Sequence, residues 1–112
     1  MVLNLSRNSI ENIKPLKNSK KMKILNLSDN SISNIEALED STELVNIHLE
    51  GNLIKGLENL KSLKSCTGLK NIHLQTMSGD AMNPICGLNG YRNNVLDYLP
   101  QIRRLDSKSG II

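Results

Sequence analysis

The sequence predicts an α/β solenoid, with short parallel strands on a concave face and 3₁₀ or short helical returns on a convex face. Three observations predict it: a pattern repeats every 22 residues, its apolar spacing changes from two to three within each copy, and an asparagine marks the change. The 112 residues suffice for a single domain, 1–112.

The repeat is visible when the sequence is compared with itself at a fixed offset. Three copies align at successive shifts of 22 residues, and a fourth begins after them: LNLSRNSIENIKPL (3–16), LNLSDNSISNIEAL (25–38), IHLEGNLIKGLENL (47–60) and LKNIHLQ (69–75). One such unit cannot bury its own apolar face, but a stack of units can. The predicted repeats cover about 1–21, 22–43, 44–68 and 69–82.

Each copy contains one strand and one return. The L-x-L segments have the period of a strand with one buried face, formed by Leu3/Leu5, Leu25/Leu27, Ile47/Leu49 and Ile72/Leu74. The next apolar residues are three apart, which suits a 3₁₀ return. An asparagine recurs at the bend between strand and return: Asn8, Asn30, Asn52 and Asn83, the last of them six residues later than the repeat predicts. A side-chain amide can donate to and accept from unpaired backbone groups, so we predict a structural asparagine ladder.

The repeat stops at NPICGLNGYR (83–92), which we interpret as the start of a lid over the last Leu face. One apolar side of a short helix is expected from Tyr91, Val95, Leu96, Tyr98 and Leu99. Pro100 should end that helix, and Ile102 and Leu105 should supply a final strand. The segment TMSGDAM (76–82) reads as a projecting loop, either for contact or as slack.

The frame L-x-x-L-x-L-x-x-N-x-I-x-x-I/L-x-x-L resembles leucine-rich repeat proteins of the 22-residue class, which includes a regulatory subunit of a protein phosphatase. The block N-P-x-C, Y-R, L-P-x-x-x-x-L-D resembles the C-terminal cap of that class, found in a spliceosomal subunit, an mRNA export factor and many ciliary proteins. The resemblance implies a right-handed superhelix, a cap over 83–107 and an adaptor or scaffold. The cap residues carried over are Tyr91, Arg92, Leu99, Pro100, Leu105 and Asp106.

Charged residues alternate in sign between stacked copies, although the net charge is +3. A shift of 22 residues places Lys14 over Glu36, Lys17 over Glu39 and Lys21 over Glu43, with Lys61 beyond Glu39. We therefore expect inter-repeat ion pairs on a solvated face, each worth about 0–1 kcal/mol. The mild basicity is thus partly neutralised within the chain, which weakens a nucleic-acid interpretation.

The outward strand residues predict a polar binding face. One column should read Asn4, Asn26, His48, His73 and Asp106. The expected partner-binding residues are Asn26, Asn46, His48, Glu50, Asn71, His73, Gln75 and Arg104. Two histidines beside a carboxylate could bind zinc, but an ordinary polar column is commoner, so no metal and no cofactor are predicted.

These features favour a non-catalytic module, an adaptor, scaffold or regulatory subunit, that binds another protein. The alternative is a ribonucleoprotein component that binds RNA or an RNA-binding partner. The face carries few basic residues and no aromatic ring for base stacking, which makes nucleic acid the weaker choice. No catalytic set is recognisable, so the chain is not expected to be an enzyme.

Cellular location is predicted from cysteine usage and from the N-terminus. Cys66 occupies a small buried repeat position, and with Cys86 it matches neither a disulfide framework nor a zinc pattern. No long apolar segment opens the chain, so an intracellular, cytoplasmic protein is expected and no membrane association, with ciliary, cytoskeletal or nuclear sites left open. The first strand would have an unpaired edge through which another chain could associate.

Overall fold

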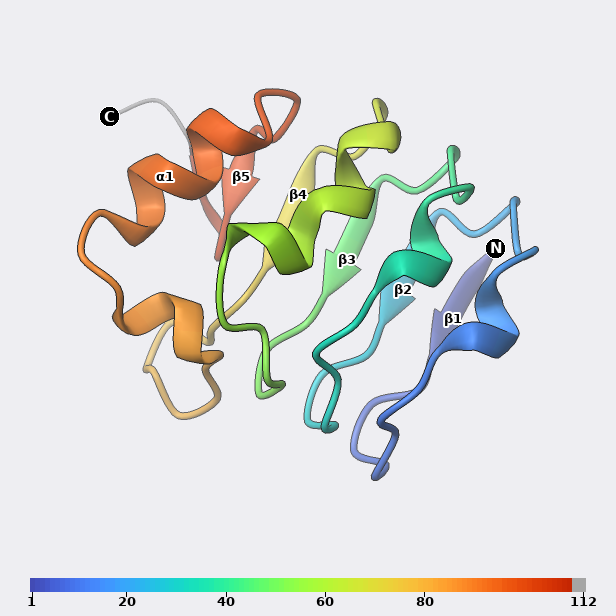
Figure 1. Ribbon diagram of the computed structural model, residues 1–112, viewed down its shortest axis with the longest axis horizontal. Coiled ribbons are helices and arrows are strands. Elements are labelled where there is room, and N and C mark those ends of the chain that lie inside the picture. The colour runs from blue at the N-terminus through green and yellow to red at the C-terminus, as the bar shows by residue number, and fades with distance from the viewer. Residues whose placement is uncertain (110–112) are drawn as a thin grey trace.

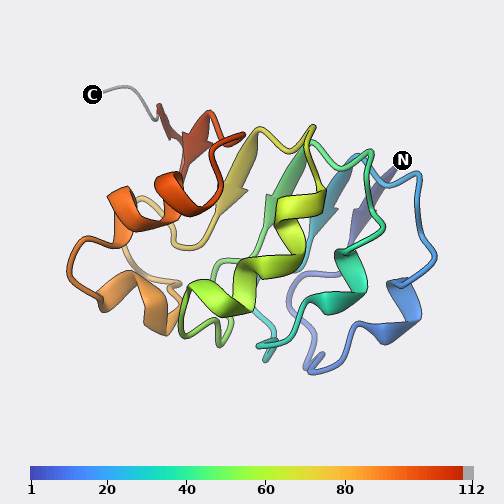
Figure 2. The ribbon, with the colours of Figure 1, turned by 45° about the horizontal axis from the view of Figure 1, so that its top comes forward.

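The computed structural model describes residues 1–109 as one six-stranded sheet covered on one side by helical returns (Figure 1). The strands follow each other in chain order: β1 (Val2–Asn4), β2 (Ile24–Asn26), β3 (Asn46–His48), β4 (Asn71–His73), β5 (Arg104–Leu105) and β6 (Lys108–Ser109). The first five are parallel, and β6 pairs antiparallel with β5. Figure 2 shows strands and returns as two layers. The predicted architecture of parallel strands and returns is confirmed.

The strands pair in the register that the sequence repeat predicts. Leu3 lies opposite Leu25, and Leu25 lies opposite Ile47, so the first two steps are 22 residues. The third step is longer, because Ile47 pairs with Ile72. The additional residues enlarge the return and leave the strand pairing unchanged, so equivalent positions still form straight rows across the sheet.

The returns are short 3₁₀ helices, as the spacing of three predicts: η1 (Lys14–Leu16), η2 (Glu36–Leu38), η3 (Leu57–Ser65) and η4 (Pro84–Gly87). The lengthened third repeat carries the nine-residue η3. After η4 comes the α-helix α1 (Tyr91–Tyr98), which ends two residues before Pro100, as predicted. In Figure 1, α1 lies at the β5 end of the stack.

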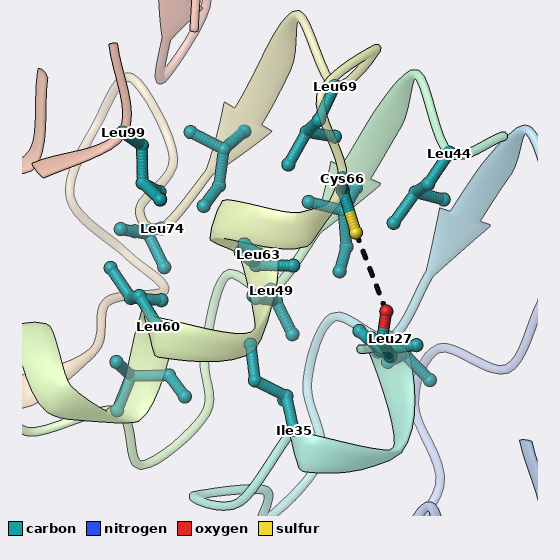
Figure 3. Close-up of a cluster of buried hydrophobic side chains, with 14 of the residues drawn as sticks. Leu27, Ile35, Leu44, Leu49, Leu60, Leu63, Cys66, Leu69, Leu74 and Leu99 are labelled. Carbon is teal, nitrogen blue, oxygen red and sulfur yellow. Dashed lines mark hydrogen bonds between the residues drawn. The ribbon is translucent and has the colours of Figure 1, made fainter. Parts of the chain in front are cut away.

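The core lies between the two layers and is built from aliphatic side chains. Figure 3 shows Leu27, Leu49 and Leu74 from successive strand segments beside Leu60 and Leu63 of η3. All five are fully buried. The first repeat has a neighbour on one side only, and its Leu3 and Leu5 are accordingly only partly buried.

Cys66 is part of this core, as predicted. Its thiol is fully buried and donates to the Leu38 carbonyl oxygen at 3.4 Å (Figure 3). Burial raises the pKa of the thiol to about 11, because the charged thiolate would lose its hydration. The side chain is therefore a neutral packing group at pH 7.

The asparagine ladder is present, and each buried amide joins its own bend to the preceding repeat. Asn52 Nδ2 donates to the Leu49 carbonyl at 3.0 Å and to the Leu27 carbonyl of the repeat before at 2.9 Å. Its Oδ1 accepts from the Ile32 N–H at 3.0 Å. Asn30 and Asn83 make equivalent bonds. Asn8 differs: its Nδ2 donates to the Leu5 and Ser6 carbonyls of its own bend, its backbone N–H donates to Asn30 Oδ1, and the residue is exposed.

The residue before each of the first three ladder asparagines has a left-handed backbone. The φ angle is +58° at Arg7, +56° at Asp29 and +70° at Gly51. Glycine adopts this conformation without strain, and Asp is among the few other residue types that tolerate it, whereas Arg7 adopts it against its usual preference. The bend geometry therefore takes precedence over local propensity in the first repeat.

The predicted inter-repeat ion pairs do not form. Returns η1 and η2 stack, and Lys14, Lys17, Glu36 and Glu39 line one shallow groove between them. None of the predicted pairs, including Lys21 with Glu43 and Lys61 with Glu39, brings its charged atoms within 4.0 Å. The charged residues do lie on neighbouring repeats, as the sequence register predicts. Their side chains are exposed, however, so hydration competes with an attraction of at most about 1 kcal/mol and no ion pair forms.

The ladder gives a direct stability prediction. We expect Asn52→Ala to lower the free energy of unfolding by about 2–3 kcal/mol, because the buried Ile32 N–H loses its side-chain partner. The exposed Asn8→Ala should cost less than about 1 kcal/mol. Urea unfolding followed by circular dichroism measures both values. Equal losses for the two variants would contradict a ladder whose strength depends on burial.

Candidate functional site

The outward side chains of the strands form two rows across the sheet, and we call this surface the concave face. The pairing places Val2, Ile24, Asn46, Asn71 and Arg104 in the first row. The second row contains Asn4, Asn26, His48 and His73. Seven of the eight predicted partner-binding residues are half-buried, and Arg104 is exposed. The structure thus brings the predicted strand residues together on one surface.

The first row changes character along the sheet. Val2 and Ile24 are 68 % and 38 % exposed, so the β1–β2 end of the face is apolar. From β3 onward the row is polar, and Asn46 Oδ1 is buried without a hydrogen-bond partner among the described residues. A buried carbonyl oxygen without a partner is costly, and a donor from a bound molecule would relieve that cost.

The second row contains a stacked pair of imidazole rings. His48 and His73 pair directly between β3 and β4, and their ring centroids lie 4.1 Å apart with planes inclined by 9°. Adjacent strands are about 4.8 Å apart, so identical side chains in register must stack or turn away from each other. Contacts at 3.4 Å join His48 Nδ1 to the Glu50 carboxylate and His73 Nδ1 to Ser107 Oγ.

Burial and mutual charge set the protonation of this cluster. Burial lowers the pKa of His73, and the neighbouring His48 lowers it further. Burial alone would raise the pKa of Glu50, but the His48 contact, the Glu50 backbone N–H and the imidazole charges lower it overall. At pH 7, His73 is therefore neutral and Glu50 is ionised.

The same three side chains have the composition of a metal site. A ring nitrogen from each of His48 and His73 and a carboxylate oxygen from Glu50 all lie within 4.8 Å of one another. All three residues are half-buried, and Glu50 Oε1 is itself buried without a hydrogen-bond partner among the described residues. The sequence had favoured an ordinary polar column here.

Asp106 does not belong to the outward column, so that part of the prediction is wrong. It is 6 % exposed, and its φ of +56° turns the chain into a hairpin with Ser107, whose φ is +68°. Its Oδ1 accepts from the Leu74 N–H at 2.7 Å and from the Gln75 N–H at 3.2 Å. Asp106 thus serves the last bend as the asparagines serve the earlier ones.

Of the other predicted cap residues, Tyr91 bonds to Asp106 and Arg92 to the neighbouring Leu105, whereas Pro100 is exposed. The Tyr91 hydroxyl donates to Asp106 Oδ2 at 2.6 Å, and burial together with this carboxylate raises the pKa of Tyr91. Arg92 donates to the Leu105 carbonyl at 3.1 Å. Leu99 and Leu105 are fully buried. Gln75 Nε2 also donates to Asp106 at 3.2 Å, which leaves this predicted partner-binding side chain already engaged.

The segment 76–82 is a hydrogen-bonded turn. The Thr76 N–H donates to the Ala81 carbonyl at 2.9 Å, and the Gly79 N–H donates to the Thr76 carbonyl at 3.0 Å. Met77 at its tip is 70 % exposed. The turn borders a shallow pocket that Tyr91 and Asp106 also line, so it lies at the edge of the terminal network.

Sequence reasoning missed the hairpin between β5 and β6, and with it the contact of Ser107 to His73. The signal was weak: Asp and Ser in succession favour turns, but the repeat frame suggested that the strand would continue through Asp106. Two consecutive left-handed residues match the tight turn that joins antiparallel strands.

Comparison with solved structures identifies the fold. A chain of the Drosophila melanogaster SNF/U2A′ complex is 32 % identical, with a TM-score of 0.69 over 80 % of this chain and 49 % of that one. Internalin C2 of Listeria monocytogenes is 21 % identical, with a TM-score of 0.68 over 92 % and 39 % of the two chains. A chain of the Chaetomium Mex67:Mtr2 subunits is 20 % identical, with a TM-score of 0.65 over 84 % and 64 %.

The protein therefore has the leucine-rich repeat fold, an α/β solenoid. It spans about half the length, or less, of the first two of these chains and 64 % of the third. No protein-family model matches the chain, and no curated protein matches its sequence. Within residues 1–109, no helix is both long and apolar enough to cross a membrane.

The terminal network gives a second stability prediction. We expect Tyr91→Phe to lower the free energy of unfolding by about 2 kcal/mol, because a buried hydrogen bond to a carboxylate is lost. Tyr98→Phe is the matched control, since its hydroxyl has no hydrogen bond to any described residue, and it should change stability by less than about 0.5 kcal/mol. Thermal or urea unfolding measures both. Indistinguishable variants would show that the Tyr91–Asp106 bond does not stabilise the end of the stack.

Proposed function

We propose that the protein is a non-catalytic protein-interaction module that binds a protein partner on its concave face. The observation that carries the proposal is the set of side chains held in two rows on a rigid sheet. Exposed Val2 and Ile24 offer apolar contact at one end, and Asn46, His48 and His73 offer hydrogen-bonding groups at the other. An interface that combines apolar contacts with polar groups that fix orientation is typical of protein partners.

The comparisons support this proposal at the level of molecular role. The SNF/U2A′ structure and the Mex67:Mtr2 structure are each described as an assembly of two proteins. By analogy with them, we propose that this chain is an adaptor, scaffold or regulatory subunit. The leucine-rich repeat proteins among its structural neighbours likewise support a binding role in place of catalysis.

The finer assignments from the sequence are part of the proposal. We propose a single domain with repeats at about 1–21, 22–43, 44–68 and 69–82, and a cap at 83–107 of the type seen in the 22-residue class. The hydrogen bonds from Tyr91 to Asp106 and from Arg92 to the Leu105 carbonyl support the cap, because they tie α1 to β5 and the last bend. We also propose an intracellular location. Both cysteines are free and their thiols bond to backbone carbonyls, which suits a reducing compartment where disulfides are rare.

A ribonucleoprotein role is the alternative, in which the partner is RNA or an RNA-binding protein. The concave face carries one exposed basic strand residue among those described, Arg104, which is little for phosphate binding. This alternative therefore enters the experiment as a separate outcome.

The test compares two variants that each carry five substitutions to alanine and lose one positive charge. The concave-face variant changes Asn46, His48, Asn71, His73 and Arg104. The control variant changes five exposed polar residues of the returns and their connections: Lys17, Asn18, Ser33, Thr42 and Ser65. Each purified protein is used to recover partners from a cell extract, with folding checked by far-ultraviolet circular dichroism.

We expect the unchanged protein and the control variant to retain a common protein band, and the concave-face variant to lose at least about 90 % of it, because interface energy concentrates in a few central residues. Equal recovery by both variants would move the site away from the concave face. Bands that disappear from all samples after ribonuclease treatment would support the ribonucleoprotein alternative.

A further inference from the structure

We propose that His48, Glu50 and His73 form a binding site on the concave face for a divalent transition-metal ion such as Zn²⁺. This site is independent of the identity of the protein partner. Its basis is geometric: three side chains of the types that bind zinc, two on adjacent strands and one in the turn after β3, hold donor atoms within 4.8 Å of one another.

The sheet positions the three ligands without any backbone change. His48 is the last residue of β3, and Glu50 follows two residues later in the turn, where its carboxylate lies 3.4 Å from His48 Nδ1. His73 lies directly opposite His48 on β4, in a parallel pairing fixed by the neighbouring core residues Ile47 and Ile72. One ligand from β3, one from the turn after β3 and one from β4 form a triangle on the outer side of the sheet.

The distances require only side-chain rotation. Tetrahedral zinc with bonds of about 2.0–2.2 Å holds its ligand atoms about 3.3–3.6 Å apart. His48 Nδ1 already lies 3.4 Å from the Glu50 carboxylate. The stacked rings must turn out of their parallel arrangement so that the nitrogen lone pairs converge on one ion.

The charge of the site suits a divalent cation. Glu50 is the only carboxylate in the triangle, its side chain is 15 % exposed, and among the side chains of residues 1–107 its one ion-pair contact is the 3.4 Å contact with His48. A bound divalent cation would replace this long contact with a direct bond to the carboxylate. Imidazole and carboxylate together suit Zn²⁺, Cu²⁺, Ni²⁺ and Co²⁺ better than Ca²⁺ or Mg²⁺, which prefer oxygen ligands.

A neighbouring hydroxyl orients one ligand. Ser107 Oγ lies 3.4 Å from His73 Nδ1, which leaves Nε2 of that ring as the metal-facing atom. Three protein ligands leave a fourth coordination position open, directed away from the core. Water, or a side chain from a bound molecule, would complete the shell.

The two thiols of the chain are kept apart from this site. Cys66 is fully buried on the opposite side of the sheet, in the core. Cys86 Sγ bonds to the Leu74 carbonyl at 3.3 Å, and burial raises the pKa of its thiol. Metal binding at the proposed site should therefore show nitrogen and oxygen ligands without sulfur, which is a spectroscopic distinction.

The experiment titrates the full chain with Zn²⁺ in competition with a chromophoric chelator and, separately, with Co²⁺ followed by absorption spectroscopy. We expect one ion per chain, and a Co²⁺ spectrum with d–d bands but no thiolate charge-transfer band. Both histidines of the chain belong to the site, so both imidazole signals in a proton NMR spectrum should shift together on binding.

The variants His48→Ala, His73→Ala and Glu50→Gln should each weaken Zn²⁺ binding by at least about 10-fold, since even outer-shell changes reach that size. Asn71→Ala, on the same face but outside the triangle, should leave binding unchanged. Glu50→His should retain binding, because imidazole also binds zinc. Far-ultraviolet circular dichroism confirms that each variant is folded.

Three results would overturn the proposal. The first is the absence of saturable Zn²⁺ binding up to about 1 mM, the weak limit of specific affinity. The second is unchanged affinity in the folded His48→Ala/His73→Ala variant, and the third is a thiolate band that disappears in Cys86→Ser. The partner-recovery experiment adds no metal, and the metal titration uses no partner. Either proposal can therefore fail while the other stands.

Discussion

The structure depends on one constraint: the bends between stacked repeats turn backbone groups inward, where they cannot reach water, and the buried amides of Asn30, Asn52 and Asn83 satisfy them. Asn52 bonds to carbonyls of its own repeat and of the repeat before, and it also receives an N–H from that earlier repeat. The bonds that close a bend are therefore the same bonds that stack one repeat on another. Bend shape and strand register cannot vary separately, which explains why a three-residue insertion enlarges η3 and leaves the pairing of β3 with β4 intact.

The end of the stack follows from the same constraint. Asp106 accepts the Leu74 and Gln75 N–H groups at the last bend, but a carboxylate has no N–H to donate. Its second oxygen accepts instead from Tyr91 of α1 and from Gln75. The ladder thus ends on a side chain that connects the sheet to the helix covering its end, and the following hairpin brings Ser107 beside His73.

Because the ladder and the core occupy the inner side of each strand, the outer side is left to other roles. The register places His48 against His73 and Glu50 close to both, although the two histidines are separated by a full repeat in the sequence. The same rows present Val2 and Ile24 as apolar contacts. The inner face of the sheet is buried, so the outward side chains line up in straight rows. These rows give both the proposed partner surface and the proposed cluster of metal-binding side chains.

The sequence by itself determined the period, the strands, the 3₁₀ returns, the ladder asparagines and the burial of Cys66, because each depends on spacing along the chain and on a pattern that recurs. Only the tertiary structure decided the features that depend on competition at a single position. Asp106 matched the outward column in spacing, but the unsatisfied N–H groups of the last bend draw it inward. Lys14 and Glu36 matched in register, but hydration keeps them apart. The stacking of His48 on His73 and their contacts with Glu50 and Ser107 likewise follow from rotamers and burial, which no repeat pattern specifies.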